Sequence, residues 1–264
     1  MRRLSKFISK RGNWSLPYLI FLLLFVVLPL ILIGVYAFQD ADGNFTFGNF
    51  VKFMTSPDAG NTFVYSMGIA IITTLICVIL GYPVAYILSN KNLCRSQVMA
   101  LLFILPMWIN ILVRTLATVA LFDFLTIPLG QGALIFGMVY NFLPFMIYPI
   151  YNTLVKMDHS YVEAAQDLGA SPATVFAKVV IPLSMPGIMS GVTMVFMPTI
   201  STFAISELLT LNTIKLFGST IQENINNGMW NYGAVLSLIM LCFILTMELF
   251  SKKDESISEN GGIL

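Results

Sequence analysis

Residues 158–186 have the sequence DHSYVEAAQDLGASPATVFAKVVIPLSMP, a polar stretch between two long apolar segments. Ser160 followed by Glu163 predicts a capping box, in which the serine hydroxyl accepts from a first-turn amide and the glutamate reaches back to the serine amide. Good helix formers follow, and Gly169 is placed to end the helix in a left-handed turn. Ser171 then predicts the cap of a second helix that begins with a proline. We therefore expect two short, water-facing helices joined at a glycine.

The composition excludes an ordinary soluble domain. Of the 264 residues, 57% are hydrophobic and 10% are charged, whereas about a quarter of a typical globular chain is charged. The net charge of +1 gives no reason to expect a nucleic-acid partner. The three cysteines are far apart and form no CxxC pair, so neither a disulfide framework nor a metal site is predicted.

Six apolar stretches are each long enough to cross the bilayer core, which takes about 20 residues of helix. We therefore predict an all-α integral membrane protein with six transmembrane helices in one domain, residues 16–250. A basic N-terminus (1–15) precedes this domain, and a polar tail (251–264), expected to be disordered, follows it. The predicted spans are about residues 16–38, 62–88, 98–122, 132–155, 186–207 and 232–250, and the loop 158–185 joins the fourth to the fifth.

The distribution of lysine and arginine predicts the orientation, because cytoplasmic loops carry an excess of both. Six spans place the two termini on the same side of the membrane. That side holds every lysine and arginine except Lys52, Arg114 and Lys215. Both termini and the loop 158–185 are therefore predicted to be cytoplasmic, and membrane lipid is expected to surround the spans. No GxxxxGK[ST] phosphate loop occurs, so we expect no ATP hydrolysis and no catalytic residue in this chain.

The loop 158–185 has a spacing with a known counterpart. The letters EAA are followed by three residues, a glycine, nine residues and then V-x-I-P, which resembles the EAA loop of ABC importer permeases, where the pattern ends in I-x-L-P. In that family the loop docks on the ATP-hydrolysing subunit. The resemblance implies that the ATPase contact involves Glu163, Ala164, Ala165, Gly169, Val179, Ile181 and Pro182.

A broader resemblance covers most of residues 61–230. The stretches LGYPVAYIL, LPMWINILVRT and VYNFLPFMIYPIYNTL are similar to those of spermidine/putrescine importer permeases of the PotB type. This implies a type I ABC importer in the bacterial cytoplasmic membrane. Its implied partners are a second permease (PotC type), a dimer of an ATPase (PotA type) that binds ATP and Mg, and an extracytoplasmic polyamine-binding protein (PotD type). The alternatives are a permease for iron, sulfate or molybdate and, from a different class, an ATP-independent channel or a structural membrane protein.

Polar side chains within the third, fourth and fifth predicted spans are candidates for a substrate path. At 1.5 Å per residue, straight helices place Asn110 and Asn141 at similar depth near the midplane, although such amides also bridge helices. Arg114 is one turn further out, where it either gates the path or forms a structural ion pair with Glu207 or Asp123. The candidate path residues are Trp108, Asn110, Tyr140, Asn141, Tyr148, Ser201, Thr202 and Glu207.

The predicted outer surface carries more acidic than basic residues. A negative vestibule concentrates polyamines and repels anions such as sulfate. If the substrate is a polycation, we expect Arg114 not to bind it directly, because like charges repel in a poorly screened channel. The outer acidic residues are Asp40, Asp42, Asp58, Asp123, Glu207 and Glu223, against Lys52 and Lys215.

Overall fold

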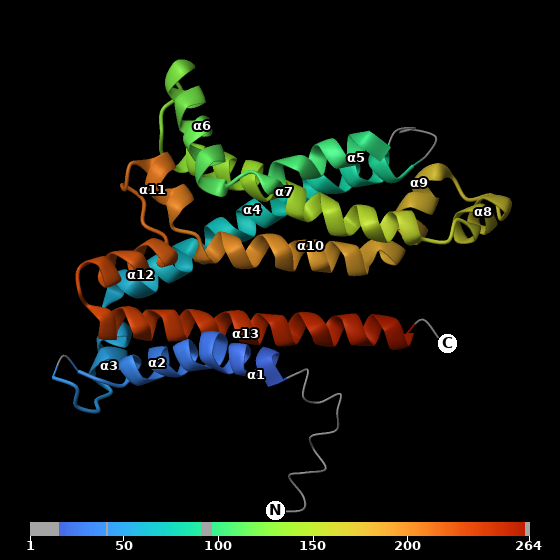
Figure 1. The fold of residues 1–264 in the computed structure, drawn as a ribbon. Coiled ribbons are helices and arrows are strands. Elements are labelled where there is room, and N and C mark those ends of the chain that lie inside the picture. The colour runs from blue at the N-terminus through green and yellow to red at the C-terminus, as the bar shows by residue number, and fades with distance from the viewer. Residues whose placement is uncertain (1–15, 41, 91–96, 262–264) are drawn as a thin grey trace, which may run out of the picture. The chain divides into compact units, whose positions relative to one another are not determined.

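The computed structural model describes residues 16–40, 42–90 and 97–261, and its regular elements there are helices (Figure 1). The chain divides into two compact units. Unit 1 combines Met1–Pro57 with Ile221–Cys242, and unit 2 combines Asp58–Thr220 with Phe243–Leu264. The expectation of an all-α protein is confirmed.

Unit 1 is built around a long apolar helix near the start of the chain. Ala37, at the end of that helix, is fully buried against Ala234 and Val235. The side-chain amide of Asn231 donates to the Gln39 carbonyl at 2.8 Å, which ties the two segments of the unit together. The helices of unit 1 are α1 (Leu16–Leu22), the π-helical η2 (Leu23–Val27), α2 (Leu28–Ala37), α3 (Gly48–Thr55) and the first part of α13 (Trp230–Gly261).

Unit 2 contains most of the remaining helices. They are α4 (Pro57–Ser89), α5 (Gln97–Ile104), the 3-10 helix η3 (Leu105–Trp108), α6 (Ile111–Phe124), α7 (Gln131–Lys156), α8 (Ser160–Asp167), α9 (Pro172–Val175), the π-helical η4 (Phe176–Val180), α10 (Ile181–Ser201) and α11 (Ala204–Thr210). The remaining helix, α12 (Phe217–Asn226), has its residues up to Thr220 in unit 2 and its residues from Ile221 in unit 1.

The core of unit 2 forms where α7 and α10 lie side by side (Figure 1). Gly187 and Gly191 of α10 form a GxxxG pattern, which allows two backbones to approach closely. A Cβ atom at Gly187 would lie 2.5 Å from Thr153 Oγ1, and one at Gly191 would lie 2.7 Å from Met146 Sδ. The close approach of α7 to these two glycines fixes the position of α10 and of the polar segment that precedes it.

Five helices in the described part of the chain are long and apolar enough to cross a membrane. Residues Leu102–Trp108 and Ile111–Phe124 qualify as a sixth span only as a pair, because they are bent by 107° at the break between them. The five single helices are Pro17–Ala37, Pro57–Ser89, Gln131–Lys156, Pro172–Ser201 and Trp230–Leu249.

The third predicted span is therefore not one straight helix. Ile109 has an extended backbone, and the Asn110 side chain accepts from the Leu112 N–H at 2.8 Å, so that Asn110 caps α6. A side chain that caps a new helix cannot also sit midway along a continuous one. The assumption of a straight third span, on which the expected shared depth of Asn110 and Asn141 rested, was wrong.

Two helix ends also differ from the sequence-based expectation. The fifth predicted span extended to residue 207, but α10 ends at Ser201, and Glu207 lies on the separate helix α11. The polar tail was expected to be disordered, yet α13 continues as helix to Gly261. Extending a formed helix avoids the unfavourable nucleation step, so a polar sequence can continue a membrane helix into water.

Candidate functional site

The EAA segment, here residues 158–182, ends its first helix in a Schellman turn. The Ala170 N–H donates to the Ala165 carbonyl at 3.1 Å, and the Gly169 N–H donates to the Gln166 carbonyl at 2.8 Å. Gly169 has a φ of +80°, a left-handed conformation that costs other residues about 1–2 kcal/mol. The prediction that Gly169 ends the helix in a left-handed turn is confirmed.

The start of α8 differs from the predicted capping box. Asp158 Oδ1 accepts from the Ser160 N–H at 2.9 Å, and Ser160 is already the first helical residue. Glu163 therefore cannot accept from that N–H, which was the second half of the predicted box. The backbone hydrogen bond from Ser160, followed by its side-chain bond, lowers the pKa of Asp158. An aspartate two residues before the first helical position is the effective cap, and sequence alone could not separate it from Ser160.

The second helix starts as predicted. The Ser171 Oγ accepts from the Thr174 N–H at 3.3 Å, and Pro172 occupies the first turn, where its missing N–H has no cost. After only four residues, α9 changes into the π-helical turn η4, in which the Ile181 N–H donates to the Phe176 carbonyl five residues earlier. This wider turn was not predicted, because π-helical turns have no simple sequence pattern.

The two alanines of the EAA motif face in opposite directions. Ala165 packs with Val162 against the core of unit 2, whereas Ala164 is exposed. Tyr161 and Leu168 are also exposed, and the Leu168 side chain is 89% accessible. Positions 161, 164 and 168 share one helix face. The exposed apolar stripe Tyr161, Ala164 and Leu168 could have been predicted from this spacing, but the sequence analysis missed the tyrosine and the leucine.

The remaining motif residues hold the segment in place. Val179 and Ile181 are partly buried against the core of unit 2, whereas Pro182 is exposed. Glu163 and Gly169 are exposed on the outer side of the helix pair. The motif thus combines residues that anchor the segment with residues that face away from the protein.

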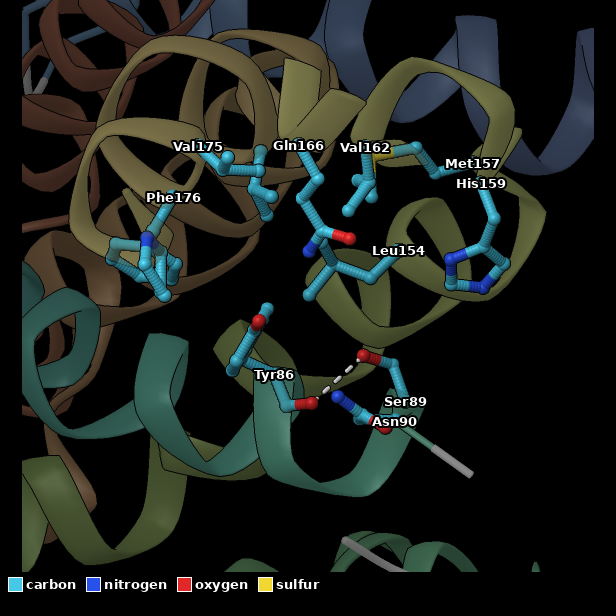
Figure 2. Close-up of a pocket in the computed structure, with 12 residues that line it drawn as sticks. Tyr86, Ser89, Asn90, Leu154, Met157, His159, Val162, Gln166, Val175 and Phe176 are labelled. Carbon is cyan, nitrogen blue, oxygen red and sulfur yellow. Dashed lines mark hydrogen bonds between the residues drawn. The ribbon is translucent and has the colours of Figure 1, made fainter. Parts of the chain in front are cut away.

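A cavity of about 130 Å³ lies beneath α8 and α9 (Figure 2). Figure 2 shows Gln166 extending from α8 into this space, with Tyr86 on the opposite wall. The other lining residues are Ser89, Asn90, Leu154, Met157, His159, Val162, Pro172, Val175, Phe176 and Val180. The EAA segment therefore rests partly on a cavity, not wholly on packed side chains.

The structure brings together three of the polar residues predicted within the spans. Arg114 is only 5% accessible, and its Nη2 lies 3.4 Å from the Asn141 carbonyl oxygen. Its guanidinium carbon is 6.0 Å from the centroid of the Tyr140 ring. The Asn141 side-chain amide donates to the Gly137 carbonyl at 2.8 Å and to Thr115 Oγ1 at 3.3 Å. Thr115 was not among the predicted residues, since a threonine inside a helix gives no distinctive signal.

This cluster contains polar atoms without partners. Within the described residues, Arg114 Nε and Nη1 and Asn141 Oδ1 are buried and form no hydrogen bond. The Arg114 guanidinium contacts a backbone carbonyl, and no ion pair with Asp123 or Glu207 is formed among those residues. A charged side chain within a membrane domain is a candidate functional residue, and its unsatisfied buried donors require a structural or functional explanation.

The other predicted path residues lie elsewhere in unit 2. Trp108 and Asn110 are exposed at the break between η3 and α6, and Tyr148 is exposed on α7. Ser201 is the last residue of α10 and Thr202 is its C-cap, and a Cβ atom added at Gly218 would meet the carbonyl oxygens of both. Glu207 is in the first turn of α11 and is half-buried.

Comparison with known proteins identifies the family. Residues 78–252 match the family model described as "Binding-protein-dependent transport system inner membrane component". The chain belongs to this family. The permease is therefore a multi-pass inner-membrane component of an ABC importer and a transport component rather than an enzyme. Membership implies permease, ATPase and binding-protein partners.

Two curated relatives of the permease share one description. The permease is 32% identical to the "Spermidine/putrescine transport system permease protein PotB" of Escherichia coli (strain K12), over 89% of this chain and 96% of that protein. It is also 32% identical to the protein of the same description from Haemophilus influenzae, over 82% and 84% of the two chains. The predicted resemblance to PotB-type permeases is confirmed.

Solved structures show the same fold. The permease matches a chain of a bacterial ABC transporter involved in the import of the acidic polysaccharide alginate, with a TM-score of 0.70 at 15% identity over 98% and 99% of the two chains. It matches a chain of the MetNI methionine ABC transporter with a TM-score of 0.56 at 14% identity over 76% and 94%. At these identities the likeness concerns the fold alone.

Proposed function

We propose that the permease crosses the membrane six times, with the type I importer arrangement and both termini in the cytoplasm. Five helices are long enough for single spans, and the bent pair Leu102–Trp108 and Ile111–Phe124 supplies the sixth. The excess of lysine and arginine on the side of the EAA segment supports the orientation. In this arrangement the EAA segment faces the compartment that contains ATP.

The ATPase subunit docks on the exposed side of α8. The observation that carries this proposal is the apolar stripe Tyr161, Ala164 and Leu168 on an otherwise polar loop, because an exposed apolar patch favours a partner surface. Glu163 borders the stripe, and the turn at Gly169 sets where it ends. ATP and Mg are bound by the partner ATPase, and this chain itself holds no cofactor.

Replacing Leu168 by aspartate, or Glu163 by lysine, tests the docking surface. We expect either variant to insert in the membrane but to lose copurification with the ATPase and at least tenfold in uptake. Leu168→Asp buries a charge in an apolar interface, which is costly, and Glu163→Lys reverses the charge at its border. Met54→Asp is the matched control, since Met54 is 81% exposed on α3 of unit 1. Normal ATPase binding by both α8 variants would place the contact elsewhere.

The substrate is a polyamine, delivered by a PotD-type binding protein to this permease and a PotC-type second permease above a PotA-type ATPase dimer. The support is the description shared by the curated relatives and the acidic character of the predicted outer residues. Glu207, half-buried on α11, is a carboxylate that can meet an incoming ammonium group without full desolvation.

Transport by the reconstituted complex tests the substrate. We expect uptake of radiolabelled spermidine that excess putrescine inhibits and that sulfate, molybdate and ferric citrate do not affect. Glu207→Gln should lower spermidine uptake severalfold while leaving complex assembly and basal ATP hydrolysis unchanged. Uptake of one of the anions or of iron in place of spermidine would reject the polyamine assignment, and an unchanged rate for Glu207→Gln would remove this residue from the path.

A further inference from the structure

Phe176 is the first residue of η4 and links the EAA segment to α4. Its ring packs edge-on against Tyr82, with 5.8 Å between centroids, and against Tyr86, with 5.1 Å. The two tyrosines are one helical turn apart on α4, so they present two successive rings on one face. Phe176 is therefore held by a pair of aromatic side chains from a helix that is distant in sequence.

One of these tyrosines also holds the helix that follows η4. The Tyr82 hydroxyl lies 2.9 Å from Ser184 Oγ in the first turn of α10. Because Ser184 donates its own proton to the Ile181 carbonyl at 3.0 Å, Tyr82 is the donor in this pair. Tyr82 and Ser184 are both buried. Tyr82 thus contacts the first residue of the π-helical turn and the helix that follows it.

The π-helical turn η4 is the kind of element that can rearrange. A π-helical turn holds one residue more than the α-helical ladder allows, and such turns are rare and occur often at functional sites. Phe176 also lines the cavity of about 130 Å³ beneath α8 and α9 (Figure 2). Tyr86 and Ser89 of α4 line the same cavity, so the Phe176 ring borders unfilled space beside its contact with α4.

We infer that Phe176 is a positioning residue that transmits displacement of α8 and α9 to α4 and α10 through Tyr82, Tyr86 and Ser184. The inference rests on the proposed docking of the ATPase on α8. A force on α8 moves η4, and the ring of Phe176 converts that movement into a shift of two membrane helices. Without the ring, the cavity absorbs the displacement, and ATP hydrolysis continues without transport.

The experiment compares Phe176→Leu with Phe63→Leu in the complete transporter, reconstituted in proteoliposomes with its ATPase, second permease and binding protein. Phe63 is a matched control, since it is also partly buried and has two edge-on partners, Phe217 at 5.1 Å and Phe243 at 5.3 Å. The readouts are spermidine uptake, ATP hydrolysis and the number of ATP molecules consumed per spermidine. A packing role alone changes uptake and hydrolysis together.

For Phe176→Leu we expect normal assembly, near-normal ATP hydrolysis and about tenfold less uptake, so that the ATP consumed per spermidine rises about tenfold. Phe176→Tyr keeps the ring and should restore the ratio. For Phe63→Leu the ratio should stay unchanged. An equal fall of uptake and hydrolysis in Phe176→Leu, or the same ratio in both leucine variants, overturns the inference.

Tyr82→Phe provides a second test that does not depend on the folding of Phe176→Leu. It keeps the ring beside Phe176 but removes the hydroxyl that donates to Ser184. We expect the ATP consumed per spermidine to rise at least twofold, and an unchanged ratio contradicts the relay. If Leu168→Asp keeps normal ATPase binding and uptake, the docking proposal fails. If Leu168→Asp loses both, and the Phe176 and Tyr82 variants keep the normal ATP consumed per spermidine, only the relay fails.

Discussion

Glycine has opposite roles in the α7–α10 core and in the EAA segment of unit 2. At Gly187 a side chain would meet Thr153 and the Pro149 carbonyl oxygen, so the position demands a small residue in ordinary helical backbone. At Gly169 there is open space, and a φ of +80° demands a residue that tolerates left-handed backbone. The choice of residue is thus limited by side-chain volume in the core and by backbone conformation in the EAA segment.

The largest effect is expected in the core. Gly187→Ala should cost about 1–3 kcal/mol through overpacking, and Gly187→Leu should prevent folding. Thermal unfolding in detergent measures both. The control is Gly68→Ala on α4, because a Cβ atom added there would have no neighbouring atom within 4 Å. This variant should gain about 1 kcal/mol of helix stability. A tolerated leucine at position 187 would show that α7 and α10 are not packed backbone to backbone.

The second effect, at Gly169, should be independent of side-chain size. Both Gly169→Ala and Gly169→Leu should cost about 1–2 kcal/mol locally, and both should reduce uptake about tenfold because the end of α8 shifts. Gly228→Ala in unit 1 has the same backbone requirement, with a φ of +77° and open space. This control should lose similar stability but keep uptake. Uptake that fell with residue size at 169 would indicate a steric role instead.

A third test examines whether the buried cluster around Arg114 and Asn141 in unit 2 contributes to the substrate path. Arg114→Gln removes a buried guanidinium with unpartnered nitrogens beside Asn141. We expect spermidine uptake to fall severalfold while the preference for cations over anions is unchanged, since a like charge does not bind the substrate. Competition between spermidine and sulfate measures this. If the variant instead abolished uptake of sulfate or molybdate, Arg114 would be an anion-binding residue, and the polyamine assignment would fall.

The smallest effect is expected at the start of α8. Asp158→Ala removes the acceptor of the Ser160 N–H, so hydrogen exchange in the first turn of α8 should accelerate while uptake changes less than about twofold, as for an exposed cap. The hydrogen bond lowers the pKa of Asp158. Its contribution is therefore present above the usual carboxyl pKa and is lost only as the pH falls through the lowered value. Equal protection factors for these amides at pH 6 and pH 8 in the wild-type chain, with the intrinsic pH dependence of exchange divided out, would agree with this, and a marked difference would contradict it.

Local chemistry explains which features of the EAA segment were predictable. Ser171, Pro172 and Gly169 act through their own backbone and the few residues beside them, so the cap, the first turn and the left-handed end follow from sequence. The choice between Asp158 and Ser160 as cap of α8 was not predictable. Both side chains can accept the same hydrogen bonds, and the backbone path into the helix selects one.

The residues themselves determined the membrane character, the helical class, the family and the positions of most apolar helices, because hydropathy and motif spacing are properties of contiguous chain. Tertiary structure alone decided the 107° bend before α6, the burial of Arg114 beside Asn141 and the aromatic contacts of Phe176 with α4. Each of these depends on which distant helix occupies the neighbouring space. No local pattern encodes that, since packing energy is set by the shapes of both partners.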